Sequence, residues 1–203
     1  MSDTISLSLW YSQLRLAELG EKLETILRQF AAHGGEHGVF SATAWAVNWR
    51  EAAAYQEVYG GGEHACQIEI AVNDALELLH ADYAYEFQIG WTLWEPELDG
   101  GAHPKWVRTP RLVRVIAYGP EFDDGAYEQE GHIRIDFGTD APFLQENVAL
   151  TPEALRCIEE NIRQLIELTN VIEKESEAAA RLLWSELGES LASRLLSRLN
   201  RLQ

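Results

Sequence analysis

The segment His33-Gly34-Gly35-Glu36-His37 has the spacing H-x-x-E-H. In zinc peptidases with this pattern, the two histidines bind the metal and the glutamate acts as general base. That chemistry needs both histidines on one face of a rigid helix. Gly34 and Gly35 each disfavour a helix by about 1 kcal/mol relative to alanine. The simpler interpretation is a histidine-rich loop that ends the preceding helix.

A second Gly-Glu-His sequence follows at residues 62–64. If the two loops met in space, His33, His37 and His64 would supply ligands for zinc or another divalent metal. Glu36 would then be the candidate catalytic base. Nothing in the sequence brings the loops together, and no Cys-x-x-Cys pair supports zinc binding. A metal-dependent hydrolase is therefore the alternative, and two unrelated glycine loops are the preferred interpretation.

Three polar residues, His132, Arg134 and Asp136, alternate with apolar residues and so share one face of an expected strand. Glu86 and Arg114 are expected on the same face of neighbouring strands. A histidine beside a carboxylate and an arginine can carry out acid–base chemistry or bind a small molecule. The simpler interpretation is a solvated sheet face on which opposite charges pair. This face is the candidate ligand-binding site.

An acidic loop is expected around Gly125, where Asp123, Asp124, Glu128 and Glu130 cluster. Calcium binds oxygen-rich loops of this kind, but the spacing of an EF-hand is absent. We therefore interpret the loop as an exposed acidic turn.

The strands that would position these residues follow from alternating apolar residues. We expect strands at residues 5–11, 39–47, 66–72, 83–94, 111–118 and 133–137. A helix with Ser12 as N-cap should extend to Phe30, because leucine and isoleucine follow at helical spacing. Asp74 should cap one or two further helical turns, and residues 49–59 are ambiguous, with a short helix as one option.

After Phe137 the apolar period becomes helical. Thr151-Pro152-Glu153 combines a capping hydroxyl, a first-turn proline and a first-turn acid, which is typical of a helix start. Apolar residues at 3–4 spacing then continue and shift to another face at Leu183 and beyond. We expect one long helix or a helical hairpin with a turn near residues 174–176.

These elements predict an α+β protein with a mostly antiparallel sheet of five or six strands and helices on one side. Residues 1–150 would form the α+β body. Residues 151–203 would form a helical segment packed on the body or on another chain.

The composition narrows the classes of partner. The chain has 203 residues and a formal charge of −17, which disfavours nucleic acids and anionic membranes as partners. No apolar stretch has the length of a membrane span. Two cysteines far apart, and no basic residue ahead of the first apolar run, suggest a cytoplasmic protein.

The charge is unevenly distributed. Residues 51–104 contain eleven acids and no Lys or Arg, whereas residues 190–203 contain no acid and carry Arg194, Arg198 and Arg201. We expect an acidic, non-enzymatic interaction protein, of inhibitor, immunity or regulatory type, that forms a homo-oligomer through its C-terminal segment or binds a protein partner. No cofactor is expected. The alternatives are the metal-dependent hydrolase and a small-molecule binding protein that uses the polar strand face.

Overall fold

The computed structural model describes residues 3–97, 104–145 and 148–185. Its eight strands are β1 (Thr4–Trp10), β2 (Gly35–Ala46), β3 (Ala53–Val58), β4 (Cys66–Gln67), β5 (Tyr83–Glu97), β6 (Lys105–Tyr118), β7 (Ile133–Thr139) and β8 (Ala180–Ser185). The α-helices are α1 (Leu19–Ala32), α2 (Ile68–Leu76), α3 (Tyr127–Glu130), α4 (Ala141–Leu144) and α5 (Pro152–Glu175). Short 3-10 turns are η1 (Leu16–Glu18), η2 (Gly62–His64) and η3 (Phe122–Asp124).

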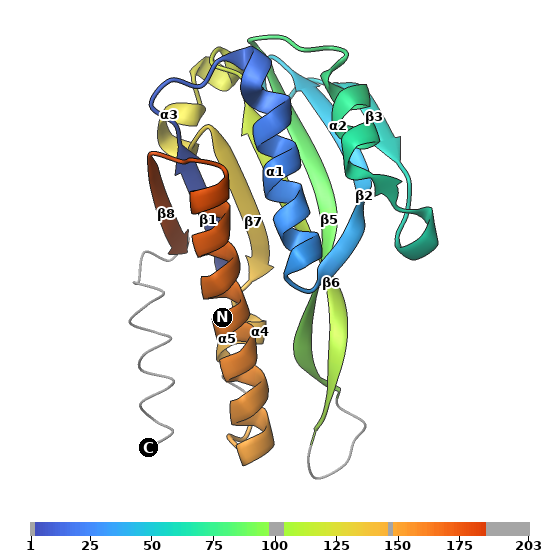
Figure 1. Ribbon diagram of the computed structural model, residues 1–203, viewed down its shortest axis with the longest axis vertical. Coiled ribbons are helices and arrows are strands. Elements are labelled where there is room, and N and C mark those ends of the chain that lie inside the picture. Colours follow the sequence, from blue (N-terminus) through green and yellow to red (C-terminus); the bar gives the residue numbers. More distant parts are fainter. Residues whose placement is uncertain (1–2, 98–103, 146–147, 186–203) are drawn as a thin grey trace.

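All eight strands join one antiparallel sheet in the order β3-β2-β5-β6-β7-β1-β8, with β4 paired to β2. The α+β class is confirmed, but the expected five or six strands are too few. The additional strands are β3, in the segment left ambiguous, and β8, in a segment expected to be helical. Figure 1 shows α1, α2 and α5 lying over the same side of the sheet.

The core lies between this sheet and these helices. Along β5, Tyr85, Phe87 and Trp91 are fully buried on the helix side, as the alternation predicted. On α1, Leu23 and Phe30 are also fully buried and belong to the same cluster. The remaining face of the sheet carries the polar residues of β6 and β7, and we call it the polar face.

Two helix starts differ from expectation. Residues 66–72 were expected to be a strand, but only Cys66–Gln67 is extended and α2 begins at Ile68. Ile68 and Val72 fit the alternating apolar pattern of a strand, but together with Ala75 they also form the apolar face of a helix, so the short pattern alone does not distinguish the two. The first helix begins at Leu19 rather than after Ser12. The backbone N–H of Arg15 donates to the Glu18 carboxylate, which starts η1 there instead.

The long helix α5 begins as the sequence predicted. The Thr151 hydroxyl accepts a hydrogen bond from the Ala154 backbone N–H at 3.2 Å, and Pro152 occupies the first turn. Asn161, which is fully buried, fixes α5 to β5: its amide donates to the carbonyls of Trp94 and Pro142, and its Oδ1 accepts from the Trp94 N–H, all at 2.9 Å. The 24 residues form one helix, which no described residue interrupts.

The expected helical continuation at Leu183 is wrong. The chain turns at Glu177, which has a left-handed φ of 58°, and then forms β8 against β1, with Leu183 opposite Leu7. Without β8, the outer edge of β1 would present unpaired backbone groups, so pairing there competes successfully with a helix. Residues 152–185 therefore share one sheet and core with the N-terminal strand (Figure 1). Residues 186–203, including the three C-terminal arginines, lie outside the described part.

No helix within the described residues combines the length and the apolar character that a membrane crossing requires.

Candidate binding pocket on the polar face

Strand register brings the polar residues of β5, β6, β7 and β1 together. Arg114 lies opposite Gln88 on β5 and opposite Asp136 on β7. Arg134 lies opposite Ile116 on β6 and opposite Ser8 on β1. The sequence prediction that Arg114, Arg134 and Asp136 share a face is therefore confirmed by the pairing.

An ion-pair network fixes Arg114. Its Nε and Nη2 donate to the two carboxylate oxygens of Glu86, both at 3.0 Å, and its Nη1 lies 3.6 Å from Asp136. The hydrogen bonds to Glu86 raise the pKa of Arg114. Glu86 is buried, so this fork-shaped pairing supplies the partner that a buried carboxylate needs.

Arg134 is held from three sides. Its Nη1 donates to Glu130 at 2.5 Å, and its Nη2 donates to the Ser6 hydroxyl at 3.2 Å. Its guanidinium lies 5.0 Å from the ring centre of Trp184, whose indole N–H donates to Ser8 at 3.0 Å. The strand β8 thus supplies an aromatic contact that supports the polar face.

A segment of residues 121–130, which we call the roof segment, folds over one end of the polar face. Its Phe122 is fully buried against Ala84 and Ile116, residues of the sheet. Asp123, Asp124 and Gly125 follow with left-handed φ angles of 45°, 56° and 83°. Aspartate and glycine are among the residues that tolerate this conformation best.

The roof segment is tied to the turn between β2 and β3. The Asp123 backbone N–H donates to the Val47 carbonyl at 2.8 Å. Val47 has a φ of 64°, which is unfavourable for a β-branched residue. Trp49, in the same turn, makes edge-to-face contacts with Phe122 at 5.0 Å and Tyr118 at 6.1 Å.

Between the roof segment and the sheet lies a pocket of about 590 Å³. This polar-face pocket is lined by Trp49, Arg114, Ile116, Tyr118, Asp123, Asp124, Gly125, Ala126, Gln129, Glu130, Arg134 and Asp136. Its volume is within the range of small-molecule sites. Burial raises the pKa of Tyr118 to about 12, so its phenol stays protonated at neutral pH. The described residues that line it include no Ser, Thr, Cys or His.

His132 does not line the pocket with Arg134 and Asp136. It lines a neighbouring pocket of about 240 Å³ that shares the Tyr118 wall. Its Nδ1 accepts from the Tyr11 backbone N–H at 3.2 Å, and its ring lies 4.8 Å from that of Tyr127. Burial lowers the pKa of His132, so the neutral ring is favoured.

The three histidines considered as metal ligands, His33, His37 and His64, lie on different elements. His33 is the C-cap of α1, with Nδ1 2.9 Å from the Gln29 carbonyl, whereas His37 is exposed on β2. The first loop therefore does not place both histidines on one helix. His64 is exposed in η2; pairing of β4 with β2 holds this second loop beside β2. Within the described residues, no group of three or more His, Cys, Asp or Glu side chains is placed to hold a metal ion. The Glu36 side chain lies outside the described part.

Arg134 and Asp136, which the sequence placed on one strand face, line the pocket, whereas the residues on its opposite side were not predicted to belong to a site. The acidic turn at Asp123 and Asp124 was recognised, but as an exposed loop and not as part of a site. Its position between two adjacent strands of the sheet was the available signal. Trp49 gave no signal, because it reaches the pocket from a turn far away in the sequence.

Comparison with known proteins adds no constraint. No protein-family model matches the chain, and neither a curated protein nor a solved structure is significantly similar to it.

Proposed function

We propose that the protein is a small-molecule binding protein that holds its ligand in the polar-face pocket. The observation that carries the proposal is the pocket itself, which contains Arg134 and Asp136 of the candidate site in side-chain positions fixed by ion pairs. Pre-positioned polar groups in a concave site lower the cost of ordering them when a ligand binds.

A ligand screen with a blocked pocket tests the proposal. Thermal denaturation is followed against a library of small anionic, neutral and cationic compounds. Gln129→Trp places a large ring at an exposed lining position of α3, and Gln56→Trp makes the same change at an exposed position of β3. A hit should stabilise the wild type and Gln56→Trp and lose its effect in Gln129→Trp. Equal stabilisation of all three would locate binding elsewhere and refute the proposal.

A second candidate function is an acidic interaction protein for a basic partner, favoured by the eleven acids of residues 51–104. Part of this charge is paired within the fold, by Glu69 with Arg28 at 2.7 Å, by Glu86 with Arg114, and by Glu95 with Arg111. Other acids of this segment, such as Glu57 and Glu63, are exposed. Exposed charge of one sign steers an oppositely charged partner.

Self-association through the C-terminal segment also stays a proposal. A truncation at residue 150 would remove α5 and β8, which belong to the core and the sheet, so the informative truncation ends at Ser185. Light scattering should give an oligomer for the full chain and a monomer for residues 1–185. A monomer in both cases would remove this proposal and leave the binding pocket unaffected.

A further inference from the structure

The polar-face pocket is lined by more negatively charged than positively charged side chains. Its lining holds four carboxylates and two guanidinium groups. Both guanidiniums are already neutralised: Arg114 by Glu86 and Asp136, and Arg134 by Glu130. An anionic ligand would have to displace these carboxylates from partners at 2.5–3.6 Å, which opposes anion binding.

Two of the carboxylates remain available. Asp123 and Asp124 are exposed, and neither pairs with a Lys, Arg or His elsewhere in the described part of the chain. Both line the pocket on the roof-segment side. They leave the pocket with an excess of negative charge that attracts a cation.

The aromatic side chain of Trp49 in the pocket wall also favours a cation. Trp49 keeps 37% of its surface exposed although it lines the pocket. Its contacts with Phe122 and Tyr118 hold the indole in place. Tryptophan is the best aromatic partner for a cation placed over its ring. A fixed, partly exposed indole beside free carboxylates matches an organic cation.

The size and the apolar lining of the pocket indicate what kind of cation it would bind. A volume of about 590 Å³ is far larger than a bare metal ion requires. Ile116 and Ala126 supply apolar lining next to the charged groups. An aliphatic stem would contact these two side chains while its charged end reached Asp123 and Asp124.

We infer that the ligand of the polar-face pocket is a small organic cation, with an ammonium or guanidinium group on a short aliphatic stem. This inference rests on the proposed function, because it names the ligand class of the same pocket. Asp123 and Asp124 bind the charged group, Trp49 contacts it through the ring face, and Ile116 contacts the stem.

Calorimetric titration with agmatine and putrescine tests the inference, with succinate as the anion of similar length. Both cations should bind, more weakly as the salt concentration rises, and succinate should not. Asp123→Asn and Asp124→Asn should each lower the affinity about fivefold, the effect of losing a partly exposed charge pair. Asparagine tolerates the left-handed backbone of these positions, so the variants should stay folded.

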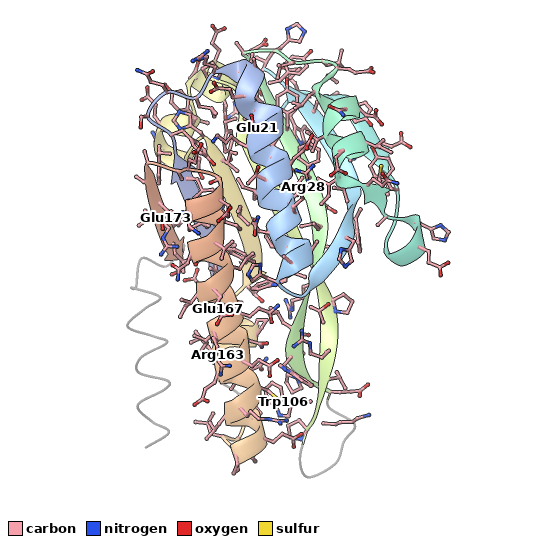
Figure 2. All side chains as sticks on the ribbon, in the orientation of Figure 1. Glu21, Arg28, Trp106, Arg163, Glu167 and Glu173 are labelled. Atoms are coloured by element: carbon pink, nitrogen blue, oxygen red, sulfur yellow. The ribbon has the colours of Figure 1, made fainter. Side chains whose placement is uncertain are left out.

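Glu21→Gln is the matched control. Glu21 is exposed on α1, on the helix side of the sheet (Figure 2). Its replacement removes the same charge, and Glu21 does not line the polar-face pocket. Its affinity for agmatine should equal that of the wild type. An equal loss in Glu21→Gln and in the Asp124 variant would mean attraction by the net charge alone and would overturn the inference.

The remaining outcomes separate this inference from the proposed function. Binding of succinate that is lost in Gln129→Trp, without agmatine binding, overturns the cation assignment and leaves the pocket function intact. If a short arginine-containing peptide binds at the pocket more tightly than agmatine, the cation belongs to a protein partner. That result would overturn the inference that the ligand is a small molecule. No binding by any compound in the screen overturns both.

Discussion

The pairing of Arg114 with Glu86 should stabilise the floor of the pocket, although Arg114 is partly exposed. Its side chain is 42% exposed and that of Glu86 is 10% exposed. Arg114→Met keeps the apolar stem but removes both 3.0 Å hydrogen bonds, leaving a poorly hydrated carboxylate. Breaking a fully buried pair costs about 3–5 kcal/mol. Screening at the exposed end reduces our expected loss to about 2 kcal/mol.

Urea unfolding of a double-mutant cycle measures this loss. The single variants are Arg114→Met and Glu86→Gln, and the double variant should be more stable than the sum of the two losses predicts. We expect a coupling of about 1.5 kcal/mol. Arg28→Met is the control, since Arg28 pairs with Glu69 and both side chains are about half exposed.

The Arg28→Met control defines the result that would refute the prediction for Arg114→Met. Removing the pairs of the half-exposed Arg28 with Glu69 and with Glu24, at 2.7 and 2.8 Å, should cost at most about 1 kcal/mol. If Arg114→Met costs no more than Arg28→Met and the coupling in the cycle is near zero, the floor network does not fix the pocket. Ion pairs would then not hold the binding groups of the pocket in position.

Three further predictions concern residues that do not line the polar-face pocket. Asn161→Ala should lower the free energy of unfolding by about 3 kcal/mol, measured by urea unfolding, because three hydrogen bonds to a fully buried amide are lost; a loss below about 1 kcal/mol would contradict it. The pKa of His132 is lowered in the folded protein. The contribution of His132 to the free energy of unfolding is therefore fully present above the unfolded pKa of about 6.5 and is lost as the pH falls below that value. The free energy of unfolding between pH 7 and 5 should therefore fall less steeply in His132→Gln than in the wild type, by at most about 1.4 kcal/mol per pH unit, and an equal slope in both proteins would contradict the prediction. Val47→Asn should raise the melting temperature, because asparagine tolerates the φ of 64° and Val47 is half exposed; the same change at exposed Val58 in β3 should lower it, and the reverse order would refute the strain argument.

Local patterns in the sequence were sufficient for some elements. Strong alternation over twelve residues gave β5 and its buried face, and the sequence around Thr151 gave the start of α5 with its cap. Both signals arise within a few neighbouring residues, so they do not depend on what packs nearby. The seven-residue pattern at 66–72 failed because it fits a helix and a strand equally well.

Other elements depended on partners far away in the chain. Residues 180–185 have leucines at positions that suit a helix, but the free edge of β1 makes them a strand. Asn161 interrupts an apolar helix face without a local reason. Its role is visible only once β5 and α4 lie beside it.

The candidate site combines both kinds of information. The sequence by itself determined that Arg134 and Asp136 share a strand face, and that an acidic turn precedes this strand, because both follow from backbone periodicity and local charge. Only the tertiary structure decided that the turn folds back over that face and that Trp49 closes the wall. Those contacts join residues distant in the chain, and their geometry is set by sheet register and core packing, which no local pattern encodes.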